Sequence, residues 1–331
     1  MTSEQEVDGM LEREPRNILA LVKKGDFRSD AGDDRAATAF YRAALRAAAA
    51  GPLSSALEPY IRRAQAKMAE ASQAFELHLE RALAAAGFPV ESRPPRFQQS
   101  IEILTGRRQV NLELQRPGGY LYPGLPQRRY YERTEFAWAQ AIEATAVSMR
   151  EELAALLASG PDRFTPYMVK DPTRPSHDFH GMVDNPEWST LYLWQNGRPV
   201  DEHVAHCPIT FETIRRLDLP FITTRAPSIL FSRLSPGARI PPHSGMLNAR
   251  LICHLPLIVP PGCGFRVGGE TRQWRPGELL VFDDTVEHEA WNNSNSDRII
   301  LIFDIWRPEL SAEERRAVTA LFEAVDAYAA A

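Results

Sequence analysis

Six short apolar runs, separated by turns rich in proline and glycine, dominate the last third of this 331-residue chain. Their length and their content of β-branched and aromatic residues are typical of strands. Many short strands with Pro/Gly turns between them are typical of sandwiches and barrels. The sequence therefore predicts a small jelly-roll barrel, with strands at 228–234, 250–259, 264–267, 279–282, 288–292 and 299–306.

Near the start of the chain, the apolar residues recur at the spacing of a helix instead. Residues 17–49 carry apolar and small side chains at helical spacing around a break, where Asp33 or Asp34 can cap the second helix. A longer amphipathic helix is expected over 55–86. The hairpin resembles one tetratricopeptide repeat, a unit that usually needs neighbours to be stable. Residues 1–87 are therefore predicted to form a helical, tetratricopeptide-like region, either as a spacer or as a groove for a protein partner.

In the middle of the chain, proline and glycine residues indicate where the predicted elements begin and end. Proline and glycine interrupt residues 88–131, which favours an irregular linker that packs on the following domain. Further elements are a helix over 136–157, a strand over 188–194, a short helix over 211–217 and a final helix over 311–330. The expected class is α+β, with a jelly-roll domain at 132–331 that has flanking helices and follows the helical region.

Composition and charge narrow the function classes. Hydrophobic residues make up 44% and charged residues 24%, which is ordinary for a soluble globular protein. The net charge of −5 argues against a nucleic-acid binder. No run is apolar enough to cross a bilayer, and the polar start MTSEQEVDGMLEREP has no signal-peptide core. Three cysteines without a CxxC pair fit reduced thiols, so we expect a cytoplasmic protein with no membrane span.

Two histidines and an arginine border the predicted strands. His243 follows a Pro-Pro corner, His288 opens a later strand, and Arg298 opens the next apolar run. In a jelly roll, the two histidines can face each other as ligands of a redox metal, although Gly245 stands where such sites usually have a carboxylate. Arg298 and Ser232 could hold the carboxylate of an oxoacid. A single buried histidine is more often a core residue, so the pattern alone leaves both interpretations open.

Three segments of this region resemble a known family. HSGMLNARLICHLPLIVP, CGFRVGGETRQWRPGELLVFDDTVEHEAWN and DRIILIFDIWRPEL are similar to the aspartyl/asparaginyl β-hydroxylase family. The likeness covers about residues 130–310 and is densest from 228 to 310. This family consists of iron(II)- and 2-oxoglutarate-dependent oxygenases with a double-stranded β-helix, a cupin-like fold. Its members bind iron through two histidines, with glycine in place of the acid, so Gly245 becomes a family feature.

The resemblance implies roles for individual residues of the site. His243 and His288 would be the iron ligands. Arg298 and Ser232 would hold the C5 carboxylate of 2-oxoglutarate, and His254 would contact its other end.

Two further residues would line the co-substrate and substrate sites. Trp194, in the segment LWQNG, would help to wall the 2-oxoglutarate pocket. Arg250 matches a family arginine that faces the acidic side chain of the substrate. The best-known animal members have RLRMH where this chain has RLICH, so Ile252 replaces an arginine and the substrate preference does not carry over. Those members also combine a tetratricopeptide-like region with the oxygenase.

Other polar clusters give weaker signals. HDFH at 177–180 and HVAHC at 203–207 lack the complete four-ligand set of a zinc site. Asp283 and Asp284 could supply the missing acid ligand, but a turn cap or a hydrogen bond that orients His288 suits them equally, and we favour that hydrogen bond.

The predicted function is that of an iron(II)- and 2-oxoglutarate-dependent dioxygenase, which uses O₂ to hydroxylate Cβ of an Asp or Asn residue in a peptide or protein. Related family members act on acyl chains of lipid A or on small or ribosomal peptides, which keeps those substrates as alternatives. A third alternative is a non-catalytic scaffold whose helices bind a partner. The joint presence of His243, His288, Arg298 and Ser232 argues against that scaffold.

Overall fold

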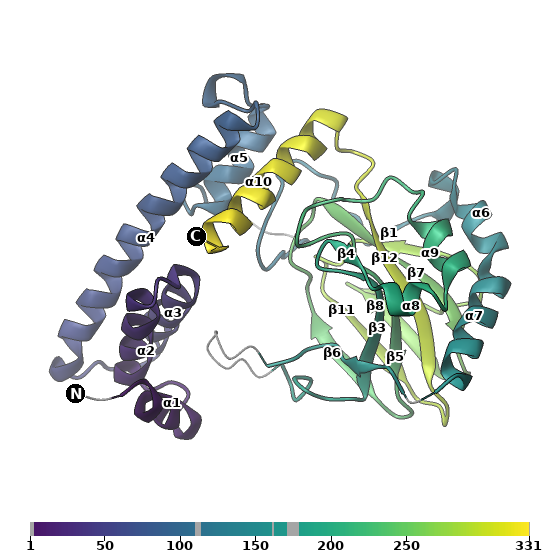
Figure 1. Ribbon diagram of the computed structural model, residues 1–331, viewed down its shortest axis with the longest axis horizontal. Coiled ribbons are helices and arrows are strands. Elements are labelled where there is room, and N and C mark those ends of the chain that lie inside the picture. The colour runs from purple at the N-terminus through teal and green to yellow at the C-terminus, as the bar shows by residue number, and fades with distance from the viewer. Residues whose placement is uncertain (1–2, 110–113, 161, 171–178, 331) are drawn as a thin grey trace. The chain divides into compact units, whose positions relative to one another are not determined.

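The structure of this chain is a computed structural model that describes residues 3–109, 114–160, 162–170 and 179–330. Two compact units make up the chain (Figure 1). Among the described residues, the first consists of 3–89, 170, 179 and 324–330 and contains helices, and the second, which holds both sheets, consists of 90–109, 114–160, 162–169 and 180–323.

The first unit contains a short first helix, a helical hairpin and a long helix after the hairpin. Its elements are α1 (Glu4–Arg13), α2 (Ile18–Asp30), α3 (Asp34–Ala49), η1 (Ser55–Leu57) and α4 (Glu58–Ala85). Asp33 caps α3 by accepting a hydrogen bond from the backbone N–H of Ala36 (3.0 Å). Helices α2 and α3 approach closely at Gly25 of α2, where a Cβ would overlap the ring of Tyr41 of α3. The predicted hairpin and the helix after it are confirmed, whereas the tetratricopeptide classification stays a prediction.

The segment predicted to be an irregular linker contains a helix. Its elements are η2 (Val90–Ser92), α5 (Pro95–Leu104) and, at its end, the strand β1 (Tyr130–Tyr131). Pro95 begins α5 because the first turn of a helix requires no N–H from its residues. The prediction of irregular structure is therefore wrong over α5, and residues 90–131 belong to the second unit.

The helix predicted over 136–157 is interrupted. After η3 (Arg133–Glu135), the chain forms α6 (Ala139–Ala144) and α7 (Ala146–Ala158). Thr145 breaks the helix, because its backbone N–H and its hydroxyl both bond the carbonyl of Ile142 (3.0 and 2.7 Å). Pro161, which was expected to end this helix together with Gly160, lies outside the described residues.

Two antiparallel sheets form the barrel. The larger has the order β1-β10-β7-β12-β5-β3-β2 with β4 on β3, and the smaller has the order β6-β11-β8-β9. The strands of the larger sheet beyond β1 are β2 (Thr165–Pro166), β3 (Trp188–Gln195), β4 (Arg198–Pro199), β5 (Ile229–Leu234), β7 (Arg250–Ile258), β10 (Leu280–Phe282) and β12 (Arg298–Trp306). Those of the smaller are β6 (Arg239–His243), β8 (Cys263–Val267), β9 (Glu270–Arg272) and β11 (His288–Asn292).

Successive side chains of each strand point to opposite sides, so the larger sheet has two different faces. One face is covered by α6, α7 and α9 (Pro208–Ile214), which lie beside it in Figure 1, and its side chains form the main hydrophobic core with those of the helices. The other face, which includes Ser232, His254 and Arg298, carries the polar residues of the barrel. The short helix α8 (Asp201–Val204) and the last helix, α10 (Ala312–Ala330), complete the fold. The protein is therefore α+β, with a double-stranded β-helix and flanking helices, as the sequence predicts.

One strand of the barrel differs from expectation. The residues before His243 were predicted to form a Pro-Pro corner, but Arg239–His243 is the strand β6, paired with β11. Proline is tolerated because β6 lies at the edge of the smaller sheet, where N–H groups on one side have no strand to bond.

Candidate metal centre and anion pocket

Two histidines from different strands lie side by side in the smaller sheet. His243 is the last residue of β6, His288 is the first of β11, and the two are register partners. Their ring centroids are 4.1 Å apart. The fold thus brings together the two residues that the sequence suggested as metal ligands.

Backbone carbonyls decide which nitrogen of each ring can bind a metal. Nδ1 of His243 lies 2.8 Å from the carbonyl oxygen of Pro241, and Nδ1 of His288 lies 3.0 Å from that of Val286. A carbonyl only accepts, so each Nδ1 carries the hydrogen and each Nε2 keeps its lone pair. Burial lowers the pKa of His243, and burial together with the neighbouring His243 lowers the pKa of His288 to about 3. Both rings are therefore neutral at physiological pH, the form that binds metals.

At Gly245, where a metal site of this kind usually has a carboxylate ligand, the side chain of Asp284 occupies the space beside the backbone. The N–H of Gly245 donates to the backbone carbonyl of Asp284 (2.6 Å), and a Cβ at Gly245 would overlap the Asp284 carboxylate. Glycine is thus required here by a close approach. Asp284 does not orient His288 through its side chain, and neither does Asp283, so the hydrogen bond that we favoured is wrong: the Val286 carbonyl orients that ring. Asp283 instead caps a turn by accepting from the N–H of Thr285 (3.0 Å), the alternative left open above.

Gly245→Asp is expected to damage the site instead of completing a three-ligand metal centre. The new side chain would overlap a buried carboxylate of like charge, which should cost about 1–3 kcal/mol of stability and weaken metal binding. Chemical denaturation and metal titration measure both effects. Gly269→Asp is the control, because a Cβ there meets nothing within 4 Å. Tighter metal binding by Gly245→Asp would contradict this interpretation of the glycine.

A buried cation lies at the start of β12. Arg298 is 1% exposed, donates from Nη1 to the carbonyl of Ser232 (3.2 Å) and packs 4.7 Å over the ring of Trp274. Its Nε has no hydrogen-bond partner, and no carboxylate of the described residues acts on its charge. Burial lowers its pKa to about 10, so the group remains charged at neutral pH. An unpaired buried charge is costly, which makes this a natural site for an anionic ligand.

His254 faces the same interior. The indole N–H of Trp274 donates to Nδ1 of His254 (3.3 Å), so the hydrogen of the neutral ring is on Nε2 and can be donated to a ligand. Burial, with Arg298 and His288 nearby, lowers the pKa of His254 well below its usual value. Trp274 was not selected from the sequence, although it contacts both Arg298 and His254.

Trp194 does not lie with these residues. A register shift between Tyr192 and Trp194 interrupts the alternation of β3, and Trp194 pairs with Ile229 of the helix-covered face. Its ring stacks on Phe211 of α9 with centroids 5.8 Å apart. The structure therefore contradicts its expected place in the wall of the interior pocket. No local sequence signal reveals such a bulge.

Trp188, at the other end of β3, contacts the histidine pair. Its ring centroid is 5.9 Å from that of His243, and Tyr167 stacks on it with ring centroids 4.2 Å apart. The two aromatic rings thus form a wall beside the histidines.

Arg250, on β7, is bound by two carboxylates. Nη1 donates to Asp304 (3.3 Å) and Nη2 to Asp284 (3.2 Å). Burial raises the pKa of both aspartates, in the case of Asp284 to about 6 and despite the opposing effect of Arg250. Ile252 follows on the same face of the strand and is 8% exposed.

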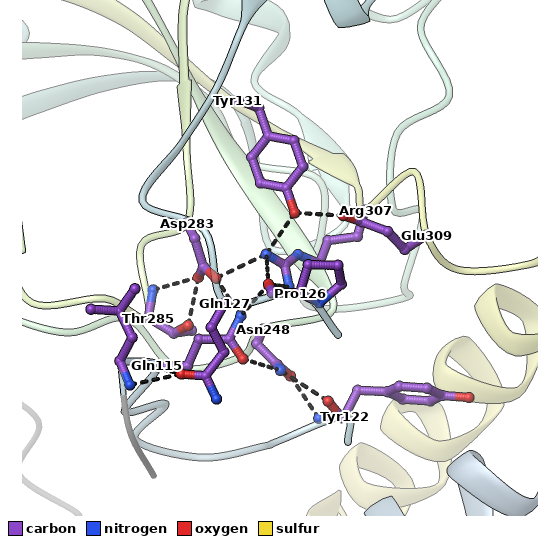
Figure 2. Close-up of polar contacts among 11 residues, drawn as sticks. Gln115, Tyr122, Pro126, Gln127, Tyr131, Asn248, Asp283, Thr285, Arg307 and Glu309 are labelled. Atoms are coloured by element: carbon purple, nitrogen blue, oxygen red, sulfur yellow. Dashed lines mark hydrogen bonds and ion pairs between the residues drawn. The ribbon is translucent and has the colours of Figure 1, made fainter. Parts of the chain in front are cut away.

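A buried polar network holds the loops of this site (Figure 2). Arg307 and Asp283 form an ion pair of 2.9 Å in which both side chains are 0% exposed. Arg307 also donates to the hydroxyl of Tyr131 (2.9 Å). Gln115 donates to Asp283 (2.5 Å) and accepts from Asn248 (3.0 Å). These residues connect β1, the segment before it, the loop before β7, the loop after β10 and the end of β12.

The segment around Gly118 adds backbone bonds to the same loops. The N–H of Arg116 donates to Thr285 (2.7 Å), and that of Gly118 donates to Gly245 (2.9 Å). The neighbouring Gly119 is also tightly placed, since a Cβ there would lie 3.1 Å from the Met246 side chain. The run PGGY was a usable sequence signal, because paired glycines often mark such contacts.

The alternative metal clusters receive no support within the described part of the chain. His177 lies outside the described residues. His203 bonds the carbonyl of Tyr192 through Nδ1 (2.7 Å), and Cys207 is buried, which raises its pKa to about 12. No group of three or more His, Cys, Asp or Glu side chains suited to a metal is found among the described residues.

The fold and these residues define a class: a double-stranded β-helix protein with two neutral, paired histidines and a buried arginine whose Nε has no hydrogen-bond partner. A sequence profile described as "Aspartyl/Asparaginyl beta-hydroxylase" matches residues 143–308, half of the chain. The chain belongs to the aspartyl/asparaginyl β-hydroxylase family, a family of hydroxylases.

Individual relatives agree with this assignment. The human aspartyl/asparaginyl beta-hydroxylase is 39% identical over 41% of this chain and 18% of its own length. The human aspartate beta-hydroxylase domain-containing protein 1 is 31% identical over 66% of this chain and 54% of its own length. An ornithine lipid ester-linked acyl 2-hydroxylase from Rhizobium tropici is 30% identical over 56% of this chain and 63% of its own length. The chain thus spans less than two thirds of each.

Solved cupin structures superpose only in part. A predicted oxalate decarboxylase from Thermotoga maritima covers 36% of this chain, with 14% identity and a TM-score of 0.25. A Cupin 2 conserved barrel domain protein from Salinispora arenicola covers 40%, with 12% identity and a TM-score of 0.25. In the part of the chain that the structure describes, no helix has the length and apolarity to cross a membrane.

Proposed function

We propose that this protein is an iron(II)- and 2-oxoglutarate-dependent dioxygenase that hydroxylates Cβ of Asp or Asn residues in a peptide or protein. The observation that carries the proposal is the register pair of His243 and His288, in which backbone carbonyls hold Nδ1 of each ring and the unprotonated nitrogen is Nε2. Membership of a hydroxylase family supports it. The helical unit is proposed to bind the protein partner, in a cytoplasmic setting.

The donor set fits iron with open coordination positions. His243 and His288 would hold the ion, and Gly245 leaves no room for a third protein ligand at its position. Iron bound there would supply the oxygen activation that a C–H hydroxylation requires.

The chain's own residues bind the co-substrate and exclude water. Arg298, buried without a carboxylate partner among the described residues, would bind the C5 carboxylate of 2-oxoglutarate, and the hydroxyl of Ser232 lies 3.5 Å from its Nη1. His254 would donate its Nε2 hydrogen to the other end. Phe265 and Phe282 pack around His254, with centroids at 5.0 and 4.8 Å, and keep this interior apolar.

The proposal is tested in two stages. Anaerobic addition of iron(II) and 2-oxoglutarate should give the weak visible charge-transfer band of a chelate. Addition of O₂ and a lysate-derived peptide library should then give succinate together with a gain of one oxygen on Asp or Asn residues, found by mass spectrometry. Absence of the band would refute the iron assignment, and a band without any oxidised peptide would refute the peptide substrate.

Arg298→Met is expected to weaken 2-oxoglutarate binding by about a hundredfold, since truncating one partner of a buried charge pair costs about 2–5 kcal/mol. Folding stability should be unchanged or higher, because an unpaired buried charge is removed. Titration of the visible band and denaturation measure the two quantities. Arg233→Met, on the other face of β5, is the control for binding. Lower stability with unchanged binding would make Arg298 a structural residue.

A lipid acyl chain is the second candidate substrate. Its support is the relative named as an ornithine lipid ester-linked acyl 2-hydroxylase. Incubation with an acylated ornithine lipid under the same conditions discriminates the two, because a gain of oxygen on the acyl chain and none on peptides would favour the lipid.

A further inference from the structure

We propose that the substrate side chain is the neutral carboxamide of Asn and not the carboxylate of Asp. This inference rests on the proposed function, which leaves both residues open. It is carried by the cluster of Arg250, Asp284 and Asp304 and by one buried oxygen of Asp284 that has no hydrogen-bond partner in the structure.

The arginine that could attract an acidic side chain is already occupied. Both ends of the Arg250 guanidinium are bound, by Asp304 at 3.3 Å and by Asp284 at 3.2 Å. All three side chains are largely buried, with 18%, 3% and 8% of their surface exposed. One positive and two negative charges leave this cluster with an excess negative charge, which disfavours a substrate carboxylate.

The cluster also has an acceptor without a donor. Oδ1 of Asp284 is buried and has no hydrogen-bond partner in the structure, while Oδ2 is used by Arg250. A buried acceptor that stays unsatisfied costs free energy. The carboxylate lies against Gly245, two residues after His243, so a ligand that satisfies it would lie beside the candidate metal ligands.

The chemistry of the two side chains then decides between them. A carboxamide brings two N–H donors and a carbonyl, whereas an ionised carboxylate only accepts. The side chain of a substrate Asn can therefore donate a hydrogen bond to Oδ1 of Asp284 without adding charge. The carboxylate of a substrate Asp could not, because both it and the Asp284 carboxylate only accept hydrogen bonds. Ile252, which follows Arg250 on the same face, offers no cation to compensate.

Two peptide pools with identical degenerate flanks test this, one with a central Asn and one with a central Asp. With the full chain, iron(II), 2-oxoglutarate and O₂, we expect at least about tenfold faster oxygen incorporation into the Asn pool. Asp304→Asn keeps the hydrogen-bond acceptor for the N–H of Ser228 but removes one charge from Arg250. It should shift the Asn-to-Asp ratio toward Asp by about tenfold, whereas Asp201→Asn, on an exposed helix, should not.

A binding measurement adds a readout that does not need turnover. Under anaerobic conditions, N-acetyl-L-asparagine amide should perturb the visible band of the iron–2-oxoglutarate complex, and N-acetyl-L-aspartate amide should not.

The outcomes separate this inference from the proposed function. Equal or faster oxidation of the Asp pool overturns the inference and leaves the hydroxylase assignment intact. An Asp304→Asn variant that slows both pools equally also overturns it, because the cluster would then only support the fold. A visible band without oxidation of either pool overturns the peptide substrate and the inference with it, and absence of the band overturns the iron assignment itself.

Discussion

Alanine at both His243 and His288 is expected to abolish the visible band of the iron–2-oxoglutarate complex and the formation of succinate. The two rings are register partners that offer their Nε2 lone pairs, because backbone carbonyls hold both Nδ1 hydrogens. Loss of a group that merely orients a ligand costs about 10–100-fold in metal affinity, so loss of the ligands themselves should exceed about a hundredfold. Anaerobic titration with iron(II) measures the affinity.

His206→Ala is the matched control, because His206 is exposed and its loss should leave the band unchanged. Each single alanine variant should also lose most of the band, since two protein ligands leave no redundancy. A full band in the double variant would show that iron binds elsewhere and would refute the assignment.

Arg307→Met should destabilise the barrel unit by about 3–5 kcal/mol, since it leaves Asp283 buried without its cation. The lost bonds also include the one to the Tyr131 hydroxyl. Because all six tryptophans lie between residues 138 and 306, tryptophan fluorescence during urea denaturation reports on this unit. The urea concentration at the midpoint of unfolding should therefore be lower in the variant than in the unchanged protein.

Arg215→Met is the control for the loss of an ion pair as such. Its partner Glu212 is one helical turn away, and both side chains are more than 40% exposed, so the change should stay below about 1 kcal/mol. The double variant Arg307→Met/Asp283→Asn should recover part of the loss, because no uncompensated charge remains. Equal effects of Arg307→Met and Arg215→Met would contradict a supporting role of the network in Figure 2.

Local pattern predicted most of the barrel. The strand at 288–292 has the predicted bounds, and β5, β7, β8, β10 and β12 each begin or end within a residue of the prediction. Apolar runs bounded by Pro/Gly turns fix such strands because burial and turn chemistry act over a few residues. The helical hairpin and its cap at Asp33 follow from the same local rules.

Prediction failed where a distant part of the chain decides the conformation. Pro241 and Pro242 suggested a corner, yet they belong to a strand because β6 lies at a sheet edge. Trp194 was predicted to line the 2-oxoglutarate pocket because the segment LWQNG resembles the family, yet a bulge in β3 turns its side chain toward α9. Neither an edge position nor a bulge is visible in the residues themselves, since both depend on which strand pairs with which.

The amino-acid sequence by itself determined the fold class, because strand length and turn chemistry are local properties, and it singled out the two histidines and Arg298 through their spacing and the family resemblance. Only the tertiary structure decided what surrounds them. It placed the Asp284 carboxylate in the space beside Gly245 and bound Arg250 between two aspartates. Charge balance in a buried site depends on contacts between residues far apart in the chain, so the preference for Asp or Asn is a property of the folded barrel.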